Sequence, residues 1–164
     1  HAGIIAQIHD AGQTCRCGGA NYNARVKLSV KSDYAARAVL ELAWRESKGR
    51  ACRAEELAVA AGTSANYLVQ ILLDLKAAGL VRSIRGKKGG YLLGRPVEEI
   101  SLGDVLRAVD GSVLTTPALE DGQCPPALQE AWEQLRNAST AAADEATFDR
   151  LCEADARGRE MYHI

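Results

Sequence analysis

Long apolar runs and aromatic side chains are both scarce in this 164-residue sequence. No apolar stretch approaches the roughly 18 residues that a membrane-spanning helix needs. The N-terminal stretch HAGIIAQIHD lacks the basic flank and the longer apolar run of a signal peptide. These absences predict a cytoplasmic protein with no membrane partner. With one Phe and two Trp, the core is expected to consist mainly of aliphatic side chains and alanines in packed helices.

The groups that usually carry out catalysis are also missing. The three histidines, His1, His9 and His163, all lie near the ends of the chain. We find no Gly-rich phosphate loop between a strand and a helix, no Ser/His/acid set and no histidines at metal-binding spacing. The sequence therefore argues against an enzyme.

The cysteines do not suggest a disulfide framework. They are odd in number and irregularly spaced, and in a chain without an export signal this indicates reduced thiols. The Cys15-x-Cys17 pair lacks the four ligands of a closed zinc site, so we expect no metal there. The five cysteines are Cys15, Cys17, Cys52, Cys124 and Cys152.

Charge is distributed unevenly along the chain, although the net charge is only −1. Residues 26–95 contain 13 Lys/Arg and 6 Asp/Glu, a net of +7, and residues 96–164 contain 5 and 14, a net of −9. The first 25 residues add 2 minus 1, or +1, and the three sums return −1. A basic block followed by an acidic one indicates that the first half meets a polyanion.

Helical spacing within the basic block predicts a helix-turn-helix. Apolar residues recur at three- and four-residue intervals, which predicts helices over about residues 32–48, 54–61 and 64–78. Gly62 ends the second helix, and the Thr-Ser pair that follows can cap the third. Two helices joined by a tight turn that contains Gly are typical of this motif.

A β-hairpin is predicted immediately after these helices. Residues 81–84 and 91–93 can each form a short strand, and the turn RGKKGG between them carries three positive charges and three glycines. Beyond the hairpin, Ser101 with Asp104 resembles a capping box that opens another helix. A longer helix is expected from about Pro125, and a last short helix from about residue 147, with Phe148 and Leu151 facing inwards.

The third helix has a polar side that suits DNA. Leu68, Ile71, Leu72 and Leu75 share its core face, whereas Asn66 and Gln70 project from the opposite side with Tyr67 on its flank. Asn and Gln can pair bidentately with adenine in the major groove. Ser64 lies at the N-terminal end, where a hydroxyl and backbone N–H groups can hold a phosphate. A solvent-exposed helix face with no DNA contact would carry the same residues, so the helix alone does not decide between the two interpretations.

The hairpin favours DNA contact over that alternative. Arg85, Lys87 and Lys88 supply positive charge at its tip, and Arg82 adds charge at its base. An Arg on a Gly-rich tip suits the negative potential of a narrow minor groove. Charge runs are often only solvated turns, but this one follows a helix-turn-helix within the basic block.

These segments resemble a known family. KLSVKSDYAARAVLELA and then RGKKGGYLLGRP followed by ISLGDVLRAVDG are similar to the Rrf2 family of winged-helix regulators, typified by IscR, NsrR and CymR. The resemblance is dense over residues 27–111 and looser to the end. It implies a dimeric, sequence-specific regulator whose third helix reads the major groove and whose wing reaches the minor groove. By position, the residues implied or expected to contact DNA are Lys31, Tyr34, Ser64, Asn66, Tyr67, Gln70, Arg82, Arg85, Lys87 and Lys88.

The predicted fold is mostly α with a small β-hairpin wing, a winged helix-turn-helix followed by a long C-terminal dimerisation helix. Residues 1–25 are interpreted as an extension, a tag or upstream translation, because family members usually start at the position of Lys27. Residues 26–95 form the predicted DNA-binding domain. Residues 96–164 form the predicted helical dimerisation and sensor region, with Leu128, Trp132 and Leu135 pairing to a second copy.

The resemblance also raises the question of an iron–sulfur cluster. Many family members hold one through three cysteines between the Asp-Gly after the fourth helix and the dimerisation helix. That segment here, DGSVLTTPALEDGQCPPALQEAW, contains Cys124 alone, and Cys152 and His163 lie outside it. We therefore expect no cofactor, with Cys124 only a weak candidate ligand, and regulation by a partner protein, a small molecule or thiol oxidation.

The predicted function is a homodimeric repressor that binds specific double-stranded DNA. The alternative within this class is a regulator that senses redox state or iron through a 2Fe–2S cluster or a reactive cysteine. A competing class is a protein-interaction module that keeps the winged helix without binding DNA. A steep loss of DNA affinity with salt would exclude that module.

Overall fold

A computed structural model describes residues 29–46, 50–86 and 89–161 of the chain. The expected extension over residues 1–25, Lys87, Lys88 and His163 lie outside the described residues. Helices dominate the described part, and one antiparallel hairpin supplies its only sheet, which confirms the predicted fold class. The elements in chain order are α1 (Val30–Glu46), α2 (Ala54–Ala61), α3 (Ala65–Ala77), β1 (Val81–Ile84), β2 (Gly90–Leu93), η1 (Val97–Glu99), α4 (Leu102–Asp110), η2 (Pro117–Leu119), α5 (Pro126–Glu145) and α6 (Phe148–Met161).

Helices α2 and α3 form the predicted helix-turn-helix. Gly62 ends α2 in the left-handed conformation, at φ 75°, which glycine adopts without steric cost. Ser64 then caps α3, because its hydroxyl accepts a hydrogen bond from the backbone N–H of Tyr67. The two helices are bent by 100° at this turn, an angle typical of the motif.

The wing is a two-stranded hairpin that is anchored to the body at its base. Val81 pairs with Leu93 and Ile84 with Gly90. Cys52, in the segment before α2, forms an isolated bridge with Tyr91 through backbone hydrogen bonds of 3.0 and 2.7 Å. A Cβ on Gly90 would come within 2.6 Å of the Cys52 carbonyl oxygen, so this close approach requires glycine.

One continuous core joins the helix-turn-helix to the segments that follow it. Buried side chains of α1 and α3 pack with Ile100, Val105 of α4 and Phe148 of α6. Phe148 is the only aromatic residue in the buried core of the described residues, and aliphatic side chains and alanines make up nearly all the rest. This composition confirms the expectation drawn from the scarcity of aromatics.

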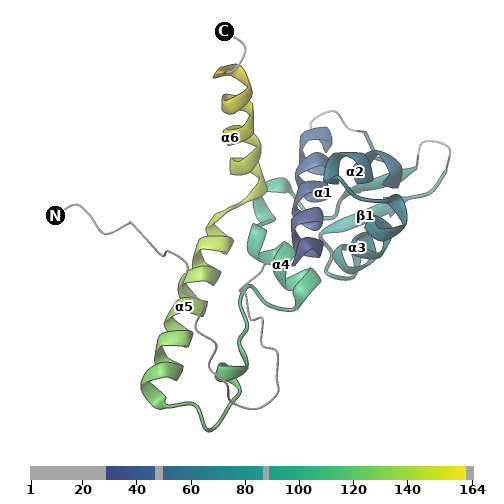
Figure 1. The fold of residues 1–164 in the computed structure, drawn as a ribbon. Helices are drawn as coiled ribbons and strands as arrows, with labels where there is room; N and C mark the ends of the chain where they lie inside the picture. The colour runs from purple at the N-terminus through teal and green to yellow at the C-terminus, as the bar shows by residue number, and fades with distance from the viewer. Residues whose placement is uncertain (1–28, 47–49, 87–88, 162–164) are drawn as a thin grey trace, which may run out of the picture.

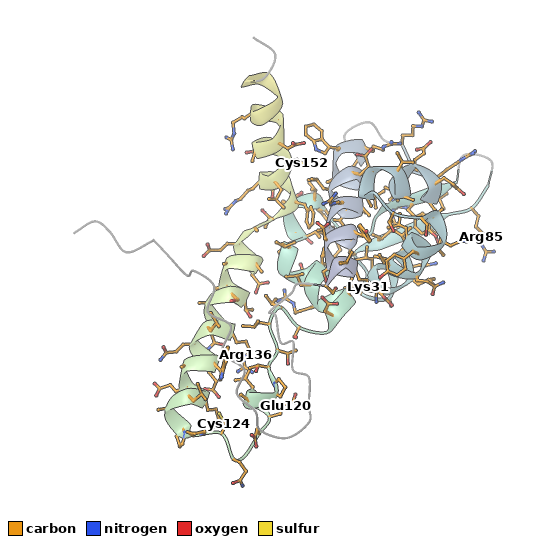
Figure 2. All side chains as sticks on the ribbon, viewed as in Figure 1. Lys31, Arg85, Glu120, Cys124, Arg136 and Cys152 are labelled. Atoms are coloured by element: carbon orange, nitrogen blue, oxygen red, sulfur yellow. The ribbon has the colours of Figure 1, made fainter. Side chains whose placement is uncertain are left out.

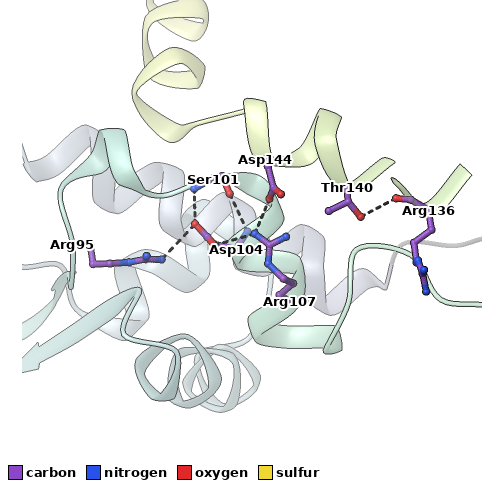
Figure 3. A network of polar contacts seen from close by, with 7 residues as sticks. All are labelled: Arg95, Ser101, Asp104, Arg107, Arg136, Thr140 and Asp144. Atoms are coloured by element: carbon purple, nitrogen blue, oxygen red, sulfur yellow. Dashed lines mark hydrogen bonds and ion pairs between the residues drawn. The ribbon is translucent and has the colours of Figure 1, made fainter. Parts of the chain in front are cut away.

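Polar contacts fasten α4 to its neighbours on both sides (Figure 3). Ser101 and Asp104 form the predicted capping box. Arg107 binds Asp104 at 3.1 Å and Asp144 of α5 at 2.6 Å, and Arg95 at the end of the wing binds Asp104 at 3.4 Å. Burial of the Asp104 carboxyl opposes ionisation, but the hydrogen bonds from Ser101 and Arg107 outweigh it, and the pKa of Asp104 is lowered. This network links the wing, α4 and α5.

Helices α5 and α6 extend beyond the body formed by α1–α4 and the wing (Figure 1). The N-terminal end of α5 projects away from the body, and α6 continues past α1, which it contacts, so that its C-terminal end projects on the other side. Among the described residues no single helix is long and apolar enough to cross a membrane; α2 and α3 taken together pass that test of length and composition, but only as a pair bent by 100°.

Candidate nucleic-acid interface

Helix α3 presents a polar row on the side opposite the core. Leu68, Ile71, Leu72 and Leu75 are fully buried, which fixes the rotation of the helix about its axis. The exposed row on the other side consists of Asn66, Gln70, Leu73 and Ala77. Asn66 and Gln70 therefore stand on the outward face that the sequence predicted, with Ser64 exposed at the N-terminal end of the helix.

The side of α3 that faces α1 is held by two contacts. The rings of Tyr34 and Tyr67 lie edge to face, with centroids 6.1 Å apart and an interplanar angle of 86°. Lys31 Nζ lies 2.7 Å from the Asp74 carboxylate, and this hydrogen bond raises the pKa of Lys31. Both predicted α1 residues therefore lie beside the third helix. Lys31 is already engaged by an acid, which the sequence did not indicate.

Replacing Asp74 by asparagine is expected to strengthen DNA binding. The change removes a negative charge from the flank of α3 and leaves the Lys31 ammonium group available for a phosphate. One additional phosphate contact steepens the log–log dependence of affinity on salt by about 0.9. Titrations of one duplex at several salt concentrations measure this slope. Asp144→Asn is the matched control, since it removes an exposed, ion-paired acid on α5; an unchanged slope for Asp74→Asn would show that Lys31 does not reach phosphate.

The wing carries Arg85 on its exposed tip, well away from α5 and α6 (Figure 2). Gly86 follows it at φ 112°, a conformation that side chains other than glycine's rarely adopt. Arg82 lies at the base of the wing, where its Nε–H donates to the Leu93 carbonyl at 3.1 Å. Arg82 also lines a groove of about 590 Å³ beside the end of α1, on the opposite side of the strand from Ser83. The two described arginines of the wing therefore lie apart: Arg82 is at the base of β1 and Arg85 at the tip, and their side chains leave opposite faces of the hairpin.

Lys76 was not among the residues predicted to contact DNA. It lies exposed in the last turn of α3, and its Nζ donates to the Ser83 hydroxyl of β1 at 2.9 Å. This contact places a positive charge between the third helix and the wing. Helical spacing could have placed Lys76 beside the polar row, but its contact with the wing depends on how the hairpin packs against α3.

Several other cations of the basic block are neutralised within the body. Arg37 pairs with Asp33 at 2.9 Å, and Arg45 pairs with Glu41 at 2.6 Å and Glu56 at 2.5 Å. These ion pairs leave fewer cations of residues 26–95 for a polyanion than the sequence count suggests, and Lys76 and Arg85 are two that the structure leaves exposed at α3 and the wing.

The described cysteines do not form a cluster site. Cys124 precedes α5 and Cys152 lies in the first half of α6, and the whole length of α5 separates them (Figure 2). Cys52 is buried in the core, and burial, with a hydrogen bond to Glu56, raises the pKa of its thiol to about 12. Burial also raises the pKa of Cys152. No three His, Cys, Asp or Glu side chains of the described residues are placed to hold a metal ion, so the described cysteines do not fit a three-cysteine cluster.

The predicted dimerisation residues lie on two different rows of α5. Leu128 and Leu135 are exposed, and they form one outward row with Ala131, Ala138 and Ala142. Trp132 is half-buried, on the row that also contains the buried Ala143. The structure thus brings the two leucines together on an apolar stripe and turns the tryptophan towards its own chain.

Comparisons with known proteins agree with this architecture. Residues 28–154 match the Rrf2 family, described as iron-dependent transcriptional regulators. The HTH-type transcriptional regulator CymR of Bacillus subtilis is 34% identical over 137 residues, which cover 84% of this chain and 97% of CymR. The solved structure of CymR, described as the global cysteine regulator of B. subtilis, covers 79% of this chain and 98% of its own at 33% identity, with a TM-score of 0.69. T. potens IscR covers 84% and 97% at 27% identity, with a TM-score of 0.70.

Proposed function

This chain belongs to the Rrf2 family of DNA-binding transcriptional regulators, and from that premise we propose that it is a homodimeric repressor that reads a specific DNA site. Its relatives and fold neighbours are regulators, so it is a transcriptional regulator and not an enzyme. We place it in the cytoplasm, with residues 26–95 as the DNA-binding domain and residues 96–164 as the dimerisation and sensor region.

The observation that carries the proposal is the orientation of α3. Its apolar face is wholly buried, so Asn66 and Gln70 share an outward face that is free to enter a major groove. Arg85 projects from the adjoining wing and suits the negative potential of a narrow minor groove. Lys76, between α3 and the wing, supplies charge for a phosphate, and Lys87 and Lys88, which follow Arg85 in the sequence, are expected to add to it.

Binding titrations with two variants test this assignment, after the preferred site has been selected from random DNA with the purified protein. Gln70→Ala is expected to cost about 1–3 kcal/mol on the selected site and little on a scrambled duplex, because it removes a bidentate base contact. Arg85→Ala is expected to weaken both duplexes, most where the minor groove is narrow, and to flatten the salt slope by about 0.9.

The matched controls are Gln134→Ala on α5 and Arg150→Ala on α6, both exposed and on helices outside the helix-turn-helix and the wing. They should leave both titrations unchanged. If Gln70→Ala weakened the two duplexes equally, Gln70 would not be a reading residue. If affinity did not fall with salt at all, the proposed DNA-binding function itself would be wrong.

We propose that the regulator works without a resident iron–sulfur cluster. The family description as iron-dependent favours the alternative, a cluster or a reactive cysteine, but Cys124 stands apart from the other described thiols. Protein purified without oxygen should be colourless and essentially free of iron, as measured by absorbance and iron assay. A stoichiometric cluster spectrum that Cys124→Ala removes would establish the iron-sensing alternative instead. Without a cluster, the effector is a partner protein, a small molecule or an oxidant of thiols.

A further inference from the structure

A leucine occupies the centre of the outward face of α3. Leu73 is 53% exposed, whereas the four aliphatic side chains of the opposite, core-facing side of α3 are fully buried. It follows Gln70 by three residues and Asn66 by seven, so all three side chains project from the same side of the helix. The flanks of this row are engaged by their own chain, through Asp74 on one side and Lys76 on the other.

We propose that Leu73 is a specificity-determining residue that packs against the 5-methyl group of a thymine in the major groove. The inference rests on the proposed function, since it requires α3 to lie in that groove. Thymine's methyl is the apolar group that base edges present there, and an aliphatic side chain is the complementary contact. Leu73 thus recognises thymine by apolar contact, and the adjacent Gln70 recognises its own base by hydrogen bonds.

The spacing along α3 also predicts where the thymine lies. Three residues advance the helix by about 4.5 Å, which is close to the roughly 3.4 Å between successive bases of one strand. With α3 lying along the groove, the thymine read by Leu73 is therefore about one base-pair step from the base read by Gln70.

A protein partner fits this leucine less well than DNA does. The neighbouring exposed side chains on the same row are Asn66, Gln70 and the small Ala77, so Leu73 is an isolated apolar group rather than a patch. Single exposed leucines are common on protein surfaces. What sets Leu73 apart is its continuity with Gln70 and Asn66 on one face, within the basic half of the chain.

Deoxyuridine, which lacks the methyl group of thymidine, provides the test. In the selected site each thymine is replaced in turn by deoxyuridine in both half-sites, and affinities are measured for the full chain and for Leu73→Ala. Burial of one methyl corresponds to about a fourfold change in affinity per half-site. We expect the unaltered protein to lose about that factor at one thymine position. Leu73→Ala should bind the thymine site about fourfold more weakly per half-site and be indifferent to deoxyuridine at that position.

Two variants serve as controls. Val59→Ala truncates an aliphatic side chain on α2 that is also exposed, and it should retain the full deoxyuridine effect. Gln70→Ala should bind more weakly but keep the same deoxyuridine effect, because the two contacts read different groups. Circular dichroism shows whether each variant is folded, and an exposed position such as Leu73 is expected to tolerate alanine.

The outcomes separate this inference from the proposed function. If the protein selects a site but Leu73→Ala responds to deoxyuridine like the unaltered protein, Leu73 does not read thymine. If Leu73→Ala changes sedimentation instead, the leucine belongs to an interface between copies, and the inference is again overturned. If no site is selected at all, the proposed function fails first.

Discussion

Replacing Leu135 by glutamate is expected to break the proposed homodimer and, with it, most of the DNA affinity. Leu135 is 47% exposed and Leu128 48% exposed on the outward row of α5, so the single chain tolerates a charge there. In a symmetric dimer each substitution appears twice at the contact, where the carboxylate is buried without a partner. An uncompensated buried charge costs about 3–5 kcal/mol, which raises the dimer dissociation constant by more than about a hundredfold.

Analytical ultracentrifugation measures the dissociation, and titration on the selected site measures the loss of binding. Ala141→Glu is the matched control: it adds the same charge to an exposed position of α5 on a different side of the helix. It should remain dimeric and bind DNA normally. Trp132→Ala is expected to have a smaller effect on assembly than Leu135→Glu, because Trp132 is half-buried on the inward row. A Leu135→Glu protein that stays dimeric would place the dimer contact elsewhere than on this row.

Of the substitutions considered, truncation of Phe148 is expected to lower the free energy of unfolding most. This side chain, the only phenylalanine in the sequence, is 1% exposed in the core that α1, α3 and α4 share. Its backbone N–H also donates to the Ile100 carbonyl at 2.9 Å, and Leu102 N–H donates to Ala146 at 2.9 Å, so the α5–α6 junction is tied to the start of α4. Phe148→Ala should lower the free energy of unfolding by about 3–5 kcal/mol.

Urea unfolding at one fixed protomer concentration measures this change, since the stability of the proposed dimer would depend on concentration. Val59→Ala, at an exposed position of α2, should stay within about 0.5 kcal/mol of the unaltered protein. A Phe148→Ala loss as small as that of the control would show that α6 contributes little to the core.

Features that depend on neighbours within a few residues followed from the sequence. The bounds of α2, the capping box of Ser101 and Asp104, and the hairpin strands were all predicted nearly as they occur. Helical spacing and caps involve residues three or four positions apart, and turn residues act through their own φ angles. These features can therefore be predicted from short stretches of sequence. The outward orientation of Asn66 and Gln70 belongs to the same class.

Contacts between distant residues needed the folded chain. Lys31 meets Asp74 only because α1 packs against α3, and Arg107 meets Asp144 across 37 residues because α5 returns to α4. At the start of α1, the Ser29 hydroxyl binds Asp110 at 2.8 Å across 81 residues. A charged residue carries no local sign of which distant partner it will meet, because the packing of whole helices sets that distance.

Length, charge asymmetry and local spacing were enough to establish the winged helix-turn-helix and the side of α3 that faces outwards. They left open which positive charges are free for DNA and which apolar residues of α5 are free for a partner. Those answers depend on burial and pairing: Lys31 is bound to Asp74, and Trp132 faces its own chain while Leu135 does not. Periodicity is a property of one helix, whereas exposure is a property of every element packed around it.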